Sequence, residues 1–293
     1  MLLVRKQEKF QSEVLIKLIR GDFMQIGNKT FELGKETYIM GILNVTPDSF
    51  SDGGRFNNVE KAINHAKEMI NEGATIIDIG GESTRPNHVP VDEEEEIRRV
   101  VPIIEALSHE IDVPISIDTY KGRVAELAIK AGASLINDVW GFKKDENIAK
   151  VAAKYDVACC LMHNRDNKNY HNFMDDVLSD LQESINIALK AGVKKEKIMI
   201  DPGFGFAKTP DHNLQIMNEL EELHKLGYPI LLGTSRKSTI VLVLDLPVNE
   251  RVEGTIATTV VGIMKGCDFV RVHDVKENLR AAIMTDAIIR GNK

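Results

Sequence analysis

The sequence predicts a single-domain (β/α)8 barrel, and the first observation behind this prediction is a repeated pattern. A helix end, a glycine and a short connector lead into four to six apolar residues that finish on a polar group. This pattern occurs in NEGATIIDIGG, KAGASLINDV, KLGYPILLGTS and KGCDFVRVHD. Glycine supplies a left-handed helix cap, and an unbroken apolar run suits a strand that is covered on both faces.

The number of candidate strands is the second observation. Four segments fit the pattern more loosely, namely YIMGILN, PISIDT, VACCLMH and KIMIDPG. Together the segments make eight candidate strands, centred near residues 42, 77, 116, 136, 160, 199, 231 and 270.

Amphipathic stretches separate these candidate strands and are the third observation. In VEKAINHAKEMINEG the apolar residues recur at helical spacing: Val59, Ala62, Ile63, Ala66, Met69 and Ile70. Further helices are expected near 93–109, 120–131, 145–155, 174–191, 211–226, 249–265 and 276–290. Eight strand-then-helix units in about 250 residues match the size of a barrel. A doubly wound sheet is the rival, but it typically has a glycine-rich first turn, which this sequence lacks.

The segment before the first barrel strand predicts a hairpin. FMQIGNKTFEL alternates in polarity and turns at Gly27-Asn28-Lys29, and we expect it to close the floor of the barrel. The domain therefore divides into an N-terminal arm and hairpin over residues 1–37 and a catalytic barrel over residues 38–293. For residues 1–22 the sequence indicates no role.

Composition limits the possible partners and compartments. The chain has 293 residues and a formal net charge of -7, which gives no basic surplus for general nucleic-acid binding. No apolar run approaches the ~20 residues needed to span a bilayer. The N-terminus does not read as a signal peptide. Cys159, Cys160 and Cys267 lie in or beside apolar runs without metal-ligand spacing, so we expect core cysteines in a cytoplasmic protein.

Polar residues end nearly every candidate strand, and active sites of such barrels lie on that face. They are Asn44 with Thr46 and Asp48; Glu82, Ser83, Thr84 and Arg85; Asp118; Asn137 and Asp138; Met162 and His163; Asp201; Ser235, Arg236 and Lys237; Arg271, His273 and Asp274. Any one of these residues could be a simple polar strand cap. Because they occur at the ends of all eight strands, they predict a binding site.

The charges of this ring predict the kind of ligand. Lys237 follows the seventh strand, and Arg271 with His273 ends the eighth, where barrels often bind phosphate. Asp118 and Asp201 are acceptors for hydrogen bonds. We therefore expect cations at one rim and carboxylates deeper, holding a molecule with a phosphate tail and a nitrogen-rich head.

A metal-hydrolase site is the alternative for these strand ends. Such sites usually need at least three convergent ligands, but Asn44-Val45-Thr46 stands where a His-x-His pair would end the first strand. His163 and His273 are too few for a dinuclear centre. A hard cation such as Mg²⁺, held by one protein oxygen and substrate phosphates, fits better.

A series of motifs resembles the dihydropteroate synthases of the bacterial folate pathway. The resemblance covers roughly residues 38–290 and follows the order of that family: MGILNVTPDSFSDGG, DIGGESTRP, ISIDTYK, INDVWGF, LMH, DPGFGFAK, GTSRKS and RVHDV. It implies a transferase that condenses a dihydropterin diphosphate with 4-aminobenzoate, yielding dihydropteroate and pyrophosphate.

The resemblance also implies roles for individual residues. Asp118, Asn137, Asp201 and Lys237 match pterin-holding positions, with Met162 nearby at the end of its strand. Arg271 would stack on the pterin and hold the diphosphate with His273 and Asn44, and Asn44 is the implied Mg²⁺ ligand. Thr84 matches a substrate contact, and Arg85 follows it. The surroundings of the aminobenzoate are matched by Phe50, Pro86, Phe206 and Ser238.

The leaving group implies a dissociative, SN1-like displacement without a covalent enzyme intermediate. Asp118 and Asp201 would stabilise the cationic pterin methylene. The loop in MGILNVTPDSFSDGG would close over this cation, with Gly53 and Gly54 as hinges and Phe50 as a cover.

Two rival functions share the barrel: a pterin-dependent methyltransferase and a non-catalytic pterin-binding protein. Lys237, Ser238, Arg271 and His273 with the long first loop argue against the methyltransferase, which needs no diphosphate grip. A non-catalytic protein would be expected to lose its loop residues, which are intact in this sequence. The family further implies a homodimer, with TIATTVVGIM (255–264) as a candidate interface, and sulfonamides that compete with aminobenzoate. Val241 and Asn87-His88-Val89 depart from the family pattern, at positions without an assigned chemical role.

Overall fold

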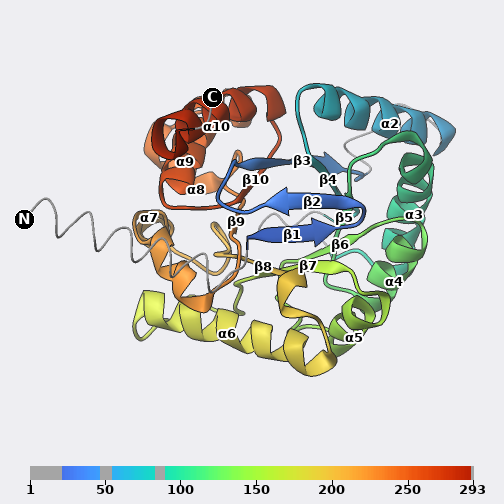
Figure 1. The fold of residues 1–293 in the computed structure, drawn as a ribbon, viewed down its shortest axis with the longest axis horizontal. Coiled ribbons are helices and arrows are strands. Elements are labelled where there is room, and N and C mark those ends of the chain that lie inside the picture. The colour runs from blue at the N-terminus through green and yellow to red at the C-terminus, as the bar shows by residue number, and fades with distance from the viewer. Residues whose placement is uncertain (1–21, 47–54, 83–89, 292–293) are drawn as a thin grey trace, which may run out of the picture.

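The computed structural model describes residues 22–46, 55–82 and 90–291, with the backbone alone for residues 55–58. Eight parallel strands in this part of the chain form the predicted barrel, in the order β8-β7-β6-β5-β4-β3-β10-β9 (Figure 1). They are β3 (Tyr38–Asn44), β4 (Ile76–Gly80), β5 (Ile115–Asp118), β6 (Leu135–Asp138), β7 (Ala158–Met162), β8 (Ile198–Asp201), β9 (Leu231–Leu232) and β10 (Phe269–Val272). A parallel bridge between Ile200 and Ile230 closes the ring.

Helices surround the barrel (Figure 1). They are α2 (Arg55–Asn71), α3 (Glu93–Glu110), α4 (Gly122–Lys130), α5 (Glu146–Tyr155), α6 (Phe173–Ala191), α7 (Pro210–Asn218), α8 (Ser238–Leu244), α9 (Val252–Met264) and α10 (Val275–Arg290). In the described part of the chain, 3₁₀ turns connect them to other elements at η2 (Lys195–Lys197), η3 (Leu220–Leu226) and η4 (Val248–Glu250).

The helices differ in two places from the prediction by periodicity. The single helix expected over 211–226 is wrong, because α7 ends at Asn218 and the 3₁₀ helix η3 follows. Leu220, Leu223 and Leu226 recur at every third residue, which is the period of a 3₁₀ helix. The short α8 matches the helix that the family resemblance places after GTSRKS. Periodicity alone did not predict it, since its apolar residues 242–244 are exposed and give no amphipathic pattern.

The two-residue period of each strand sorts its side chains between two cores. On β4, Ile77 and Ile79 face outward and join the large core between the barrel and its helices. Ile76 faces inward and joins a smaller core at the base of the barrel. Asp78 and Gly80 follow on the same inward side, so the barrel interior changes from apolar to polar towards the carboxyl ends of the strands.

The hairpin β1 (Phe23–Ile26) and β2 (Lys29–Glu32) closes the base of the barrel, as the sequence predicts (Figure 1). Its apolar residues pack with the inward side chains that begin the barrel strands. The Phe31 ring meets Tyr38 edge-on at a centroid distance of 4.8 Å and Phe269 at 5.5 Å. The hairpin therefore closes one end of the barrel, and the carboxyl ends of the strands lie at the other.

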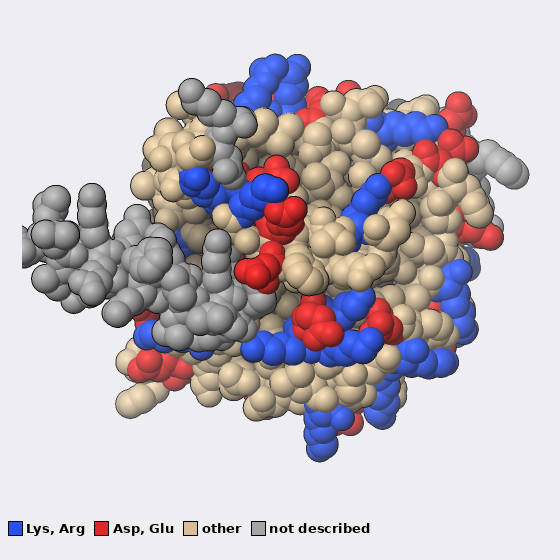
Figure 2. Space-filling view, viewed as in Figure 1, with Lys and Arg blue, Asp and Glu red and all other residues tan. Residues whose placement is uncertain are grey.

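Charges of both signs are interspersed on the hairpin face of the molecule (Figure 2). This distribution agrees with the modest negative net charge of the chain. Among the residues that the structure describes, no helix is long and apolar enough to cross a membrane.

Candidate active site

Polar side chains from separate strands converge on the open end of the barrel. Asp118 ends β5 and Asp201 ends β8, while Arg271 lies on β10. The space around Gly80 and Gly233 shows how close these side chains lie to one another. A Cβ on Gly80 would lie 3.6 Å from Asp118 Cβ and 3.8 Å from Asn44 Oδ1. A Cβ on Gly233 would lie 3.6 Å from Asp201 Oδ2 and 3.8 Å from Arg271 Cβ.

Arg271 lies between two carboxylates. Its Nε donates to Asp78 Oδ2 at 2.5 Å, and its Nη2 donates to Asp118 Oδ2 at 2.7 Å. Asp78 Oδ2 also accepts from the Asn137 side-chain amide at 3.2 Å. One network therefore joins residues of β4, β5, β6 and β10.

This network corrects the expected separation of cations from carboxylates. Arg271 is not at a separate rim, because closure of the barrel places β10 only two strands from β4 and brings its guanidinium onto Asp78. The strand-end argument also missed Asp78, since it lies in the middle of its strand. Its signal in the sequence is a carboxylate inside the apolar run IIDIG, at an inward position.

Burial and neighbouring charges shift the pKa values of the ionisable groups in this network. Burial raises the pKa of Asp118 to about 7, against the opposing effect of the Arg271 charge, and the Asp78 charge adds to the rise. Burial also opposes the charge of Arg271, but Asp78 and Asp118 outweigh it and raise the pKa of the guanidinium. Arg271 therefore stays charged, whereas the Asp118 carboxyl group titrates near neutrality.

Asp201 and Lys237 form the second half of the mouth. Asp201 Oδ1 accepts from the Gly203 backbone N–H at 2.6 Å. Lys237 Nζ donates to the Phe204 carbonyl and lies 4.6 Å from the centre of the Phe206 ring. Burial raises the pKa of Asp201 and lowers that of Lys237 to about 8, while the charge of each opposes the shift of the other.

His273 is oriented by a serine at the neighbouring strand end. Ser235 Oγ accepts from the His273 backbone N–H at 3.1 Å and lies 2.9 Å from His273 Nδ1. The Ser235 hydroxyl can in addition donate to Nδ1, an arrangement that would leave the proton of a neutral ring on Nε2. Arg236, in contrast, forms a two-bond ion pair with Asp274 and braces the loop after β9.

The remaining predicted site residues have varied positions. Met162 is buried at the inward end of β7, Ser238 is the exposed first residue of α8, and Asn44 is exposed at the end of β3. Thr84, Arg85 and Phe50 lie outside the described residues. So do Asp48, Ser83, Pro86, the hinge glycines Gly53 and Gly54, and Asn87-His88-Val89.

Two residues of the predicted ring face away from the mouth. Asp138 accepts from the backbone N–H groups of Trp140 and Phe142, both at 2.8 Å, so it caps its own loop. His163 is buried against Asp180 on α6. For these two residues the simple role of a polar cap or brace holds.

The described residues contain no cluster of three His, Cys, Asp or Glu side chains suited to a metal ion. Asn44 offers a single amide oxygen beside Asp118 at the mouth. One hard donor suits an ion that takes its other ligands from water and phosphate. This donor set fits Mg²⁺ that accompanies a phosphate ligand.

Comparisons with known proteins agree with this geometry. Residues 40–273 match the family model described as pterin binding enzyme. A dihydropteroate synthase of Clostridium beijerinckii is 68% identical over 268 residues, which are 91% of this chain and 100% of that protein.

Two solved structures are similar to this chain. One is a dihydropteroate synthase from Clostridium difficile, crystallised in the presence of pteroic acid, with a TM-score of 0.87 and 60% identity over 89% of this chain and 99% of that one. The other is the Yersinia pestis enzyme in a sulfonamide complex, with a TM-score of 0.85 and 42% identity over 92% of this chain and 100% of that one. The mouth of the barrel brings these acids and cations together, and the matches extend along nearly all of the chain. The chain therefore belongs to the dihydropteroate synthase family of pterin-binding enzymes.

Proposed function

We propose that this chain catalyses the condensation of (7,8-dihydropterin-6-yl)methyl diphosphate with 4-aminobenzoate, forming 7,8-dihydropteroate and releasing pyrophosphate in folate biosynthesis. The observation that carries the proposal is the convergence of Asp118, Asp201, Lys237 and Arg271 on one barrel mouth, in a chain that is 68% identical to a dihydropteroate synthase. The reaction is an alkyl transfer, so the chain is a transferase.

The pterin ring belongs at the polar layer of the mouth. Its amino-pyrimidinone edge presents adjacent N–H donors, which Asp201 accepts as a pair. Asn137 contributes donor and acceptor atoms, and Lys237 donates to the acceptors of the ring. Met162, buried beside this layer, supplies an apolar contact for the ring. Arg271, which donates to Asp78 and Asp118, is proposed to stack on the pterin face.

The diphosphate belongs at the rim beside the end of β10. His273, oriented by Ser235, donates from Nε2 to a phosphate oxygen, and Arg271 adds positive charge. Asn44 would hold Mg²⁺ through its side-chain oxygen, and the bound ion would neutralise the charge of the departing pyrophosphate. Thr84 and Arg85 are proposed to meet the substrate on the second loop.

Charge placement explains how this mouth promotes the reaction. Departure of pyrophosphate leaves a cationic methylene conjugated with the pterin ring. The carboxylates of Asp118 and Asp201 stabilise that cation, and such preorganised contacts are worth about 3 kcal/mol each. Aminobenzoate then attacks from the pocket of Phe206, Ser238 and Phe50. Because the aromatic amine is a weak base, no strong general base is required.

The direct test is an assay of pyrophosphate release. We expect sustained release, matched by formation of dihydropteroate, when both substrates and Mg²⁺ are present, and an absence of dihydropteroate under these conditions would contradict the proposal. Asp201→Ala should weaken pterin binding in calorimetry. Arg271→Ala should weaken the pterin diphosphate far more than the unphosphorylated pterin, and equal losses would refute the role of this cation.

Sulfonamides resemble aminobenzoate in shape, so we propose that they compete with it for the same pocket. A sulfonamide complex of the similar Yersinia pestis enzyme supports this proposal. Steady-state kinetics with varied aminobenzoate test it, and non-competitive inhibition would count against the shared pocket.

A homodimer is proposed from the apolar surface of the last two helices. Met264 on α9 is 64% exposed, and Ile283 and Ile288 on α10 are 60% and 70% exposed. Light scattering should give a dimeric mass, which Ile288→Asp reduces to that of a monomer.

The three cysteines are buried free thiols, which supports a cytoplasmic, reducing location.

A further inference from the structure

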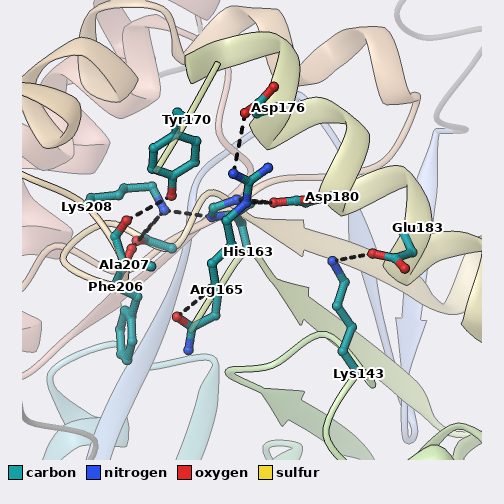
Figure 3. Close-up of polar contacts among 12 residues, drawn as sticks. Lys143, His163, Arg165, Tyr170, Asp176, Asp180, Glu183, Phe206, Ala207 and Lys208 are labelled. Carbon is teal, nitrogen blue, oxygen red and sulfur yellow. Dashed lines mark hydrogen bonds and ion pairs between the residues drawn. The ribbon is translucent and has the colours of Figure 1, made fainter. Parts of the chain in front are cut away.

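A second polar cluster lies beside the mouth, between the end of β7, α6 and the β8–α7 loop (residues 202–209) (Figure 3). Lys208 lies at its centre and is only 4% exposed. Its ammonium group donates to His163 Nδ1 at 2.8 Å, to the Gly203 carbonyl at 3.0 Å and to the Phe206 carbonyl at 3.1 Å. None of these three acceptors is a carboxylate.

His163 connects this lysine to α6. Its Nε2 lies 3.0 Å from Asp180 Oδ2, and Arg165 also donates to Asp180. Because a carboxylate accepts, Nε2 carries the ring proton and Nδ1 is left to accept from Lys208. Burial lowers the pKa of His163 to about 4, so the ring is neutral at physiological pH.

The β8–α7 loop needs these contacts because its backbone conformation is unusual. Gly203, Gly205 and Ala207 have φ values of 70°, 84° and 46°. The Gly203 and Phe206 carbonyls face Lys208, and the Phe204 carbonyl accepts from Lys237. Two lysines therefore hold carbonyl groups of the same short loop, one from behind it and one from the mouth.

We infer that Lys208 is a positioning residue for the proposed reaction. It holds the loop in the conformation that places the Phe206 ring beside Lys237 and the Gly203 N–H on Asp201. Tyr170 supports the same loop by donating its hydroxyl to the Ala207 carbonyl at 2.9 Å (Figure 3). The inference rests on the proposed function, because the groups that Lys208 positions are those of the proposed substrate pocket.

Burial of the Lys208 ammonium group has a cost, which is the loss of its hydration. Burial lowers the pKa of Lys208 to about 7, which means that its environment disfavours the charged form. Replacing Lys208 by an apolar residue would remove this buried charge but would leave three buried acceptors without their donor. Because two of these acceptors are carbonyl groups of the β8–α7 loop, loss of Lys208 should disturb this loop and the substrate pocket first.

The test compares Lys208→Met with Lys143→Met by steady-state kinetics and thermal unfolding. Lys143 forms an ion pair of 2.8 Å with Glu183 on the outer side of α6 and is the matched control (Figure 3). We expect Lys208→Met to raise the KM for aminobenzoate about tenfold, with a smaller loss of kcat and a lower melting temperature that still leaves the protein folded in the assay. Lys143→Met should leave all three quantities near their wild-type values.

Tyr170→Phe keeps the inference testable if Lys208→Met does not fold. This variant removes only the hydroxyl bond to the Ala207 carbonyl, and we expect a rise of about threefold in the KM for aminobenzoate. The inference is overturned if either folded variant keeps wild-type KM values, or if activity falls only in proportion to the unfolded fraction. An inactive wild-type chain would overturn the proposed function, and the inference with it.

Discussion

At the scale of single residues, burial in the mouth of the barrel brings the pKa values of one carboxyl group and one amino group close to neutral pH. Burial raises the pKa of Asp118 to about 7 and lowers that of Lys237 to about 8. The proposed reaction needs the first as a carboxylate and the second as an ammonium group. Both are in the required state only in the interval between these values.

The pH dependence of kcat/KM should therefore be bell-shaped. Below pH 7 the profile should fall as Asp118 becomes protonated, and above pH 8 it should fall as Lys237 loses its proton. Lys237→Arg should shift the alkaline limb upwards, because a guanidinium does not titrate in this range. A flat wild-type profile from about pH 6 to 9.5 would contradict these assignments.

At the scale of elements, the β8–α7 loop depends on a glycine that touches another strand end. A Cβ on Gly203 would lie 1.9 Å from the His163 carbonyl oxygen, and the φ of this residue is 70°. Gly291, at the end of α10, has a φ of 71° with nothing within 4 Å of such a Cβ. The two positions thus share a backbone conformation and differ in the space around them.

Alanine substitutions at Gly203 and Gly291 separate the cost of the left-handed backbone conformation from the cost of a steric clash. Gly291→Ala should cost about 1 kcal/mol of unfolding free energy, which is the penalty of a left-handed alanine. Gly203→Ala should cost clearly more and should reduce kcat/KM at least about tenfold, since the loop must move away from His163. Urea unfolding and kinetics measure both effects, and equal losses in the two variants would show that crowding at Gly203 is unimportant.

The hairpin is the second element with a distinct task, which is to close the base of the barrel. Phe31 is buried against Tyr38 and Phe269, whereas Phe23 on the same hairpin is 62% exposed. Phe31→Ala should therefore cost about 3–5 kcal/mol of unfolding free energy. Phe23→Ala should change it by less than about 0.5 kcal/mol. Both folded variants should keep kcat and KM, and a selective loss of activity in Phe31→Ala would contradict a purely structural plug.

At the scale of the whole molecule, buried ionisable groups couple folding to pH in opposite directions. The folded pKa of His163 is lowered from 6.5 to about 4, so its contribution to stability is present at neutral pH and is lost as the pH falls through this range. The folded pKa of Asp118 and that of Asp138 are both raised to about 7, so their contributions are present in acid and are lost as the pH rises. The wild-type curve alone therefore cannot isolate His163.

Comparison with His163→Asn isolates its contribution. Asparagine offers an oxygen to Lys208 in place of Nδ1 but does not titrate, while the aspartate contributions are common to both chains. Between pH 7 and 4.5, wild type should lose up to about 3 kcal/mol of unfolding free energy relative to the variant. Urea denaturation at both pH values measures this difference. A constant gap between the two chains would mean that His163 is not the acid-sensitive group.

Much of the architecture could be read from local patterns. The eight strands, the plugging hairpin and most helices follow from hydrophobic periods and glycine caps, because these features depend on neighbours in the chain. The polar strand ends could be recognised for the same reason, since each follows its own strand in the chain. Periodicity alone missed the break after Asn218 and the short α8, since a 3₁₀ period and an outward apolar face differ from an amphipathic helix.

The sequence by itself determined the barrel, its family and the set of residue types at the mouth. Only the tertiary structure decided which of those residues pair. Closure of the barrel brings Arg271 onto Asp78 and Asp118, although they are 193 and 153 residues apart in the chain. It also turns His163 and Asp138 away from the mouth and gives Lys208 its place behind the loop. Such pairings depend on the three-dimensional distance between strands, which no local pattern of residues encodes.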